Sequence, residues 1–329
     1  MLIGQSTTPR PTTIEQLLGA QTIARLDRLD LLSRKILSGT LPGERRSKRR
    51  GRSVEFDDFR DYTPGDDLRH IDWNIYARLD RLFIKLFREE QDLSLHLVVD
   101  ATASMDAGNP NKLVYAHGLA MALAYVGVVN QNRVSVSTFD APGPGRPAVR
   151  ALMPVRGRTA VRRIGGFLLE GLRETRSPGG GADPGEVLVT ALRAAARTNA
   201  GRGIVVVISD FLCPSGCAPG LAYLGAACMS GVMDAYCVQV NSPGEADPEQ
   251  EAAAGLFGDL RLTDAETGRA AEVTVTPDSV RDYRAARAAY KDALHAECAS
   301  RGIAHAEVST RTPIEALVLG TLRRGGLLR

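Results

Sequence analysis

The residues best suited to chemistry are a carboxylate and two hydroxyls that follow an apolar run. The run at residues 97–99 ends in Asp100, and Thr102 and Ser104 follow it at alternate positions. A strand that carries these oxygens to its carboxyl end builds a small pocket lined by oxygen atoms. Hard divalent cations such as Mg²⁺ prefer oxygen ligands. The spacing therefore predicts a cation site made by Asp100, Thr102 and Ser104.

A second carboxylate, Asp210, follows another apolar run at residues 204–209. In open α/β sheets, ligands bind beyond the carboxyl ends of the strands. The spacing of Asp100, Thr102 and Ser104 resembles the metal-ion-dependent adhesion site of von Willebrand factor A domains, Asp-x-Ser-x-Ser, with Thr102 replacing the first serine. The resemblance implies that Asp210 lies beside Asp100 as a later acidic ligand. It also implies that a partner's acidic side chain completes the coordination of Mg²⁺.

The same resemblance implies a threonine ligand from an intervening loop, where this chain has Gly181-Ala182-Asp183. Ala182 supplies no oxygen, so the site is one protein ligand short. Mg²⁺ readily keeps several waters, and a water can fill that position. The alternative interpretation is that Thr102 and Ser104 only cap the next helix or stabilise the loop.

Alternating strands and helices must position these residues. The strands are expected at residues 94–99, 134–139, 148–153, 204–209, 235–240 and 303–308. The helices are expected at residues 112–130, 160–173, 186–197, 221–229, 279–300 and 313–322. Apolar strands of this kind suit a parallel sheet covered on both faces. The alternation predicts an α/β domain with a doubly wound, mostly parallel sheet.

Three segments are expected along the chain. Residues 1–40 hold a disordered start and one amphipathic helix over 12–37, which begins with a capping box at Thr12-Thr-Ile-Glu15. Residues 41–92 hold a basic loop and a segment with a tight turn at Thr63-Pro-Gly-Asp66. Residues 93–329 form the α/β domain, with a β-hairpin inserted near 256–275.

The segment at residues 50–90 is dense in charged, aromatic and turn residues. Its most informative positions are Arg50-Gly51, Glu55-Phe56, Arg60, Tyr62, Pro64-Gly65-Asp66-Asp67, Arg69, Ile71-Asp72-Trp73, Ala77-Arg78, Leu82 and Glu90. Together they resemble the signature of the bacterial family called domain of unknown function fifty-eight, and a looser match continues through Leu262-x-Asp264-x-Glu266-Thr267-Gly268. The resemblance implies that the segment packs on a von Willebrand A-like domain. It also implies a MoxR-type AAA+ ATPase, or its client, as partner.

Two sets of charged residues are candidates for contact with a partner. Asp66 and Asp67 lie at the expected turn. The second set is a basic run that can bind acidic protein, phosphate or an anionic surface, namely Arg45, Arg46, Lys48, Arg49, Arg50 and Arg52. No aromatic residues are interleaved with this run, so we do not expect nucleic-acid binding. The alternative for both sets is internal pairing or solvation.

Composition narrows the class of protein. The 329 residues are 44% hydrophobic and carry a net charge of +3, which fits a globular protein and does not indicate a nucleic-acid binder. The five cysteines form no C-x-x-C pair and the start of the chain has no signal peptide, so we expect reduced thiols and a cytoplasmic protein. The apolar stretch at 113–129 is interpreted as a buried helix rather than a membrane span.

These observations favour a non-enzymatic protein-interaction module of von Willebrand A type that acts in protein assembly, maturation or stress response. The sequence has no Walker A motif and no G-x-S-x-G elbow, so neither ATP hydrolysis nor a serine nucleophile is expected. Two alternatives stay open. One is a metal-dependent phosphohydrolase that uses the same acids, and the other is a scaffold whose basic loop binds anionic surfaces.

Overall fold

The structure is a computed structural model in which the chain forms two units. It describes residues 8–27, 29, 31, 54–64, 66–89, 93–143, 147–174, 184–198, 203–213, 216–231, 233–251, 257–266 and 268–328. Residues 1–40 and 93–329 make up the larger unit, and residues 41–92 make up the smaller one. The smaller unit is therefore inserted in the sequence of the larger.

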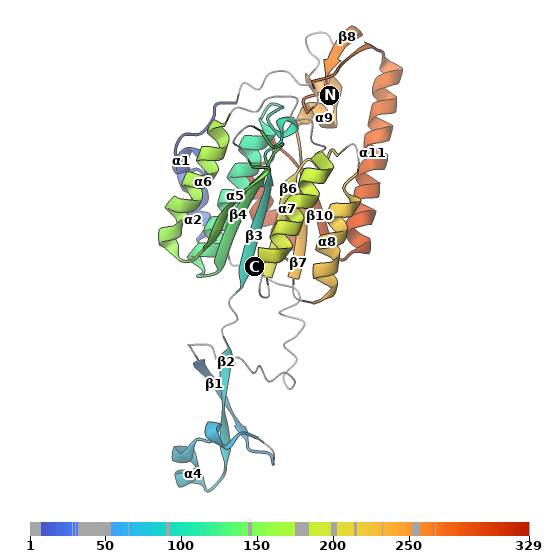
Figure 1. The fold of residues 1–329 in the computed structure, drawn as a ribbon. Coiled ribbons are helices and arrows are strands. Elements are labelled where there is room, and N and C mark those ends of the chain that lie inside the picture. Colours follow the sequence, from blue (N-terminus) through green and yellow to red (C-terminus); the bar gives the residue numbers. More distant parts are fainter. Residues whose placement is uncertain are drawn as a thin grey trace. The chain divides into compact units, whose positions relative to one another are not determined.

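A six-stranded sheet forms the centre of the larger unit (Figure 1). In chain order its strands are β3 (Ser94–Asp100), β4 (Arg133–Phe139), β5 (Val149–Val155), β6 (Gly203–Ser209), β7 (Met233–Asn241) and β10 (Ala304–Ser309). They are arranged in the order β10-β7-β6-β3-β4-β5, and only the β4–β5 pair is antiparallel. The predicted mixed α/β fold with a mostly parallel sheet is confirmed.

The strand order reverses between β3 and β6. From β3 the chain proceeds outward through β4 to β5, and then returns to place β6 on the other side of β3. From β6 it proceeds outward again through β7 to β10. The connections that leave the carboxyl ends of β3 and β6 therefore diverge, and such a point is where open α/β sheets bind ligands.

Helices cover both faces of the sheet (Figure 1). One face is covered by α1 (Ile14–Leu17), α2 (Ala20–Leu26), α5 (Lys112–Val129), α6 (Val161–Arg173), α12 (Ile314–Ala316) and the π-helix η4 (Leu317–Leu322). The other face is covered by α7 (Pro184–Thr198), α8 (Ala218–Met229) and α11 (Pro277–Ser300). Along β3, Leu97 and Val99 pack in the first core and Val98 packs in the second. This burial on both sides explains the continuous apolar runs.

Helix α5 is apolar on every side because it is surrounded. It packs against β3, β4, α1, α2, α6 and α12. Within the described part of the chain it is the one helix long and apolar enough to cross a membrane, and 89% of it is buried in the structure. The core helix of a soluble domain passes the same length and hydropathy test, so α5 is weak evidence for a membrane span.

The single N-terminal helix expected over residues 12–37 is wrong. Two short helices, α1 and α2, are separated at Gly19, whose φ of +25° interrupts the helical path. The cap is Thr13 rather than Thr12, since the Thr13 hydroxyl accepts the Gln16 N–H over 3.3 Å. Farther on, Leu31 forms an antiparallel bridge with Leu328, and both side chains are buried. Residues 32–37 lie outside the described part of the chain.

The smaller unit is a two-stranded ribbon with short helices. Strands β1 (Val54–Asp61) and β2 (Phe83–Glu89) pair antiparallel, and η1 (Leu68–His70) and α4 (Trp73–Leu79) lie between them in sequence. These strands were not predicted from the sequence. Asp72 caps α4 by accepting the Asn74 and Ile75 N–H groups, and it forms an ion pair with Lys85 at 2.9 Å. That this segment packs on the α/β domain stays a prediction.

The docking of α1 on α6 can be tested at two adjacent glycines of α6. A Cβ on Gly165 would lie 2.5 Å from the Ile14 side chain, whereas a Cβ on Gly166 meets nothing within 4 Å. We expect Gly165→Ala to lower the free energy of unfolding by roughly 1–3 kcal/mol through overpacking. Gly166→Ala should raise it by up to about 1 kcal/mol through helix propensity. Urea denaturation measures both, and equal effects would contradict the docking of α1 on α6.

Candidate functional site

Asp100 and Asp210 lie at the carboxyl ends of adjacent strands. Asp100 is the last residue of β3, and Asp210 directly follows β6, the parallel neighbour of β3. Their residues are only 4% and 2% exposed. The Ser209 hydroxyl at the end of β6 donates to Asp100 Oδ2 over 2.5 Å and so joins the two strand ends. The structure thus brings the two acids together where the strand order reverses.

Thr102 and Ser104 lie directly beside Asp100. The Thr102 N–H and hydroxyl donate to Asp100 Oδ1 over 2.9 and 2.7 Å, and the Thr102 and Ser104 hydroxyl oxygens are 3.1 Å apart. The short helix η2 (Ala103–Met105) holds this loop. Neither hydroxyl caps α5, because the Asn111 side chain accepts the Val114 N–H in that role. The prediction that they cap this helix is therefore wrong, and the alternative that they only stabilise the loop stays open.

A buried lysine, which was not predicted from the sequence, is the principal partner of Asp210. Lys112 Nζ donates to Asp210 Oδ2 over 2.7 Å and to Glu245 Oε1 over 2.5 Å, and the Lys112 side chain is fully buried. Burial opposes its charge, but the two carboxylates outweigh this effect and raise the pKa of Lys112. Lys112 is the first residue of α5, where the helix dipole disfavours a cation. The ion pairs must therefore offset both costs.

Glu245 connects a third strand end to this lysine. It lies in α9 (Pro243–Ala246), which follows β7 and precedes the short helix α10 (Pro248–Glu251). Its Oε2 accepts the Ser242 N–H over 2.9 Å in a capping box, which leaves Oε1 for Lys112. The sequence signal was a Ser-x-x-Glu pattern directly after a strand. The signal for Lys112 was a lone charge at the start of an otherwise apolar helix.

The backbone after Asp210 is strained and tightly held. Phe211 has a φ of +56°, in the left-handed region that bulky side chains rarely adopt, and its side chain is fully buried. The Tyr290 hydroxyl of α11 donates to the Phe211 carbonyl oxygen. Asp210 Oδ1 accepts the Leu212 N–H over 3.0 Å. Such strain persists where surrounding contacts over-determine the backbone, and here it fixes Asp210 against Lys112.

A glutamate from the hairpin reaches the same tip. Strands β8 (Gly258–Thr263) and β9 (Ala270–Val275) pair antiparallel, at the place where the sequence predicts a hairpin. Glu266, in the turn between them, accepts the Ser104 N–H on Oε1 over 2.7 Å. Burial raises the pKa of Glu266. In the sequence, Glu266 stands out only as part of the family resemblance, and no role is predicted for it.

The charges and oxygen atoms of this tip fit a hard cation. Burial and the neighbouring charge of Asp210 raise the pKa of Asp100 to about 7. Lys112 compensates Asp210, but it does not contact Asp100. Among the described residues no three His, Cys, Asp or Glu side chains converge on one point, so hydroxyls would have to supply part of any coordination. The Thr102 and Ser104 hydroxyls are placed beside Asp100 in a way that suits this role.

Other predicted site residues lie outside the described part of the chain. They are Ala182, the position of the missing threonine, and the basic run of Arg45, Arg46, Lys48, Arg49, Arg50 and Arg52. Their assignments stay predictions.

Asp66 and Asp67 both accept hydrogen bonds within the smaller unit. Asp66 binds Arg60 at 2.9 Å and accepts the Thr63 N–H and hydroxyl over 3.0 and 2.8 Å. Arg60 and Thr63 hold the pKa of Asp66 well below its usual range. Asp67 caps η1 by accepting the Arg69 N–H. Both carboxylates stabilise the turn of the smaller unit, and their contact with a partner stays a prediction.

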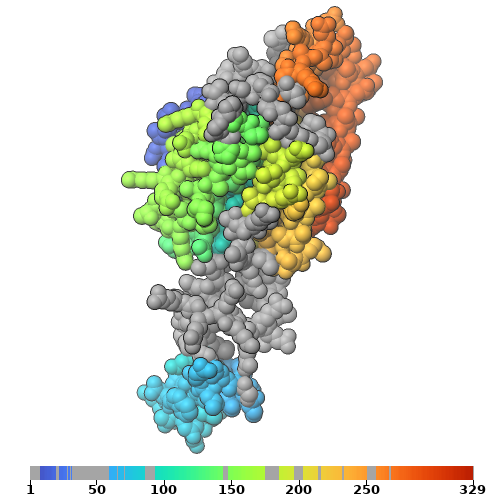
Figure 2. Space-filling view, viewed as in Figure 1, coloured from blue at the N-terminus to red at the C-terminus, as the bar shows by residue number. Residues whose placement is uncertain are grey.

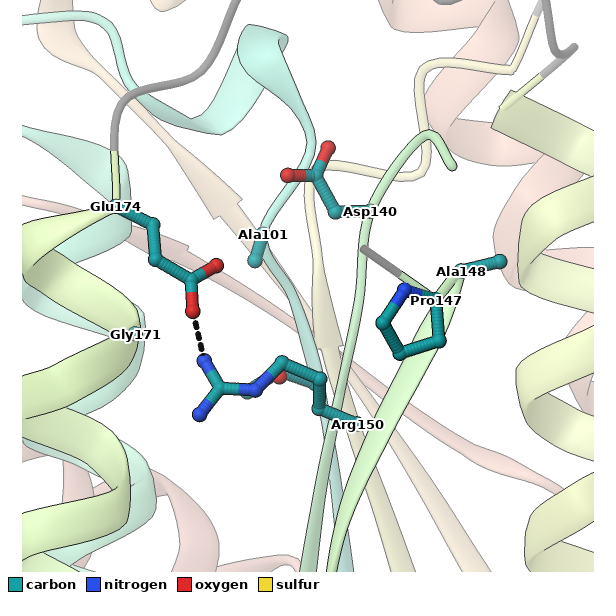
Figure 3. A pocket seen from close by; sticks show the side chains of 8 residues that line it. Ala101, Asp140, Pro147, Ala148, Arg150, Gly171 and Glu174 are labelled. Atoms are coloured by element: carbon teal, nitrogen blue, oxygen red, sulfur yellow. Dashed lines mark hydrogen bonds and ion pairs between the residues drawn. The ribbon is translucent and has the colours of Figure 1, made fainter. Parts of the chain in front are cut away.

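A small hollow lies at the same edge of the sheet, bordered by Ala101 (Figure 3). Arg150 and Glu174 form an ion pair across it, and Asp140 and Pro147 also line it. Its cavity volume is about 10 Å³. That volume holds about one water, whereas small-molecule sites measure about 300–1,000 Å³. This hollow is therefore too small to bind an organic substrate.

Removal of the buried lysine tests its structural role. Lys112→Met leaves Asp210 and Glu245 buried without a cation, so we expect a loss of roughly 3–5 kcal/mol in the free energy of unfolding. Lys291→Met is the matched control, since Lys291 is 44% exposed and forms an ion pair with Glu307 at 3.4 Å. The control should cost at most about 1 kcal/mol. Chemical denaturation that gave equal losses would contradict the role assigned to Lys112.

Known structures resemble this chain only distantly. The pilus adhesin SpaC from Lactobacillus rhamnosus GG aligns with a TM-score of 0.42 and 10% identity, over 73% of this chain and 32% of that one. The chain thus spans about a third of the length of SpaC. An uncharacterized membrane spanning protein from Vibrio fischeri aligns with a TM-score of 0.23 and 13% identity, over 71% of this chain and 98% of that one.

Sequence comparison gives a clearer result. Uncharacterized protein Rv1480 of Mycobacterium tuberculosis is 28% identical over 270 residues, which cover 82% of this chain and 78% of the relative. Uncharacterized protein Mb1516 of Mycobacterium bovis matches to the same extent. The family model described as "Protein of unknown function DUF58" matches residues 58–293. Because this match spans most of the chain and includes both Asp100 and Asp210, the chain belongs to the DUF58 family.

Proposed function

We propose that this protein is a non-enzymatic interaction module of von Willebrand A type. In this proposal Asp100, Thr102 and Ser104 hold Mg²⁺, and an acidic side chain of a partner completes the coordination. The observation that carries the proposal is the pair of hydroxyl oxygens, 3.1 Å apart, beside a buried carboxylate at the end of β3. Oxygen donors of this kind match the preference of Mg²⁺, which also keeps several waters.

The place of this cluster in the sheet supports a binding role. The cluster lies where the strand order reverses between β3 and β6, which is the usual ligand position of a doubly wound sheet. Both Asp210 oxygens already accept hydrogen bonds, from the Leu212 N–H and from Lys112. In the proposal Asp210 therefore supplies negative charge near the cation rather than a direct bond to it.

The chemistry of the loop favours binding over catalysis. A phosphohydrolase with an aspartyl nucleophile needs a second acid two positions later, to protonate the leaving group. That position is Thr102, whose hydroxyl donates to Asp100. The proposal therefore keeps the non-enzymatic assignment, and the phosphohydrolase remains the alternative.

The partner class rests on family membership and on the resemblance that goes with it. The proposed partner is a MoxR-type AAA+ ATPase or its client, in protein assembly, maturation or stress response. The proposed compartment is the cytoplasm. The mode of contact follows from the site, because a cation held by neutral hydroxyls and one carboxylate keeps the positive charge that attracts an acidic ligand.

Cation binding and partner capture are tested together. The full chain is immobilised and offered the purified MoxR-type ATPase encoded in the same genome, with Mg²⁺ or with EDTA. We expect EDTA, Asp100→Ala and Thr102→Val each to reduce capture by at least about tenfold, because each removes the cation or its ligands. The control Asp282→Ala removes a carboxylate whose side chain is 79% exposed on α11, and it should leave capture unchanged. Capture of the ATPase by Asp100→Ala at the wild-type level would contradict the metal-bridged contact.

A turnover assay distinguishes the phosphohydrolase alternative from the non-enzymatic proposal. The full chain is incubated with p-nitrophenyl phosphate and Mg²⁺ or Mn²⁺, beside Asp100→Ala. We expect wild type and Asp100→Ala to hydrolyse the substrate at the same background rate, because the Thr102 hydroxyl cannot protonate a leaving group as a carboxylic acid would. A rate well above background that the Asp100→Ala substitution abolishes would favour the phosphohydrolase.

A further inference from the structure

The β8–β9 hairpin is lightly attached to the rest of the larger unit. Figure 1 places β8 at the end of the unit where β3 and β6 terminate, and Figure 2 shows this orange segment projecting there. Most of its residues are exposed. Its apolar anchor is a small cluster in which Leu260 and Val275 pack against Val280 of α11. Elements with so few buried contacts open at low free-energy cost.

The turn of the hairpin is shaped by its own hydrogen bonds. Asp264 N–H donates to the Arg269 carbonyl oxygen over 2.8 Å, and the Asp264 carbonyl oxygen accepts the Gly268 N–H over 2.9 Å. The Asp264 side chain accepts the Glu266 N–H over 2.9 Å. None of these bonds uses the Glu266 side chain. The turn therefore needs no contact with the tip to keep its shape, and the Glu266 carboxylate has a different role.

That carboxylate contacts the loop whose Thr102 and Ser104 hydroxyls would hold the cation in the proposed function. Glu266 Oε1 accepts the Ser104 N–H over 2.7 Å. The nearby charge of Asp210 opposes the negative charge of Glu266, and no Lys or Arg in the described ranges forms an ion pair with it. A half-buried carboxylate held in this way is chemically equivalent to the acidic side chain of a partner at the same tip.

We propose that the hairpin is a built-in occupant of the tip. Glu266 fills the position of the partner's carboxylate, so that a partner must displace the hairpin before it binds. The partner would present Glu or Asp on an exposed turn, as the hairpin does. This inference rests on the proposed function for the identity of the competitor. The occupancy itself rests on the hydrogen bond between Glu266 and Ser104.

The strength of the competition follows from the covalent connection. A ligand attached to its own site by a short linker has an effective concentration in the millimolar range. The apparent affinity for an outside ligand equals its intrinsic affinity multiplied by the fraction of molecules in which the hairpin has left the tip. A substitution that weakens Glu266 should therefore strengthen capture of the partner without changing the site itself.

The first measurement needs neither partner nor cation. Hydrogen exchange is followed in the full chain for the peptide that contains Ser104, in wild type, Glu266→Gln and Glu272→Gln. Glu272 is the matched control, because it lies exposed on β9 of the same hairpin. We expect Glu266→Gln to speed exchange of the Ser104 amide by about tenfold, since a neutral amide is a weaker acceptor than a carboxylate. Glu272→Gln should leave the rate unchanged, and equal rates in all three proteins would overturn the occupancy.

The second measurement tests displacement, with the same three proteins and the ATPase capture described above, in Mg²⁺. Glu266→Gln should capture the ATPase about tenfold more tightly than wild type, and Glu272→Gln should match wild type. If wild type captures the ATPase and Glu266→Gln captures it no better, the competition is overturned. If no variant captures the ATPase while Ser104 exchange is faster in Glu266→Gln, the proposed function fails and the occupancy stands.

Discussion

The buried ammonium of Lys112 is the interaction on which the tip of this protein depends. It joins Asp210 after β6 to Glu245 after β7, and it lies at the start of α5, the helix that follows the β3 loop. The Lys112 ammonium therefore links the three connections that follow β3, β6 and β7. Without a cation there, two buried carboxylates would repel each other in a region that water does not reach. The oxygen cluster around Asp100 is placed against this fixed framework.

The sheet explains why the site lies where it does. Its central strands are buried on both faces, so charged side chains gather where these strands end. Reversal of the strand order between β3 and β6 separates the connections above these two strands, and backbone and hydroxyl groups of the β3 loop become available there. The hairpin turn then enters from a distant part of the sequence and brings Glu266 to Ser104.

Much of this architecture can be predicted from sequence, for a physical reason. A central strand buried on both faces, such as β6, must be largely apolar, and this pattern marks it in the sequence. Strands β1 and β2 were not predicted from the sequence because they mix charged and aromatic residues and contain no long apolar run. Asp100, Thr102 and Ser104 are neighbours in sequence and could be grouped. Lys112 could not be linked to Asp210 and Glu245, which lie 98 and 133 positions away.

The bridge between Leu31 and Leu328 has a consequence for the order of folding. Nearly the whole sequence separates these two residues, so the part of the core that they share closes only after residue 328 has been synthesised. Contacts of such long sequence separation form late, since their loop-closure entropy must first be offset by other structure.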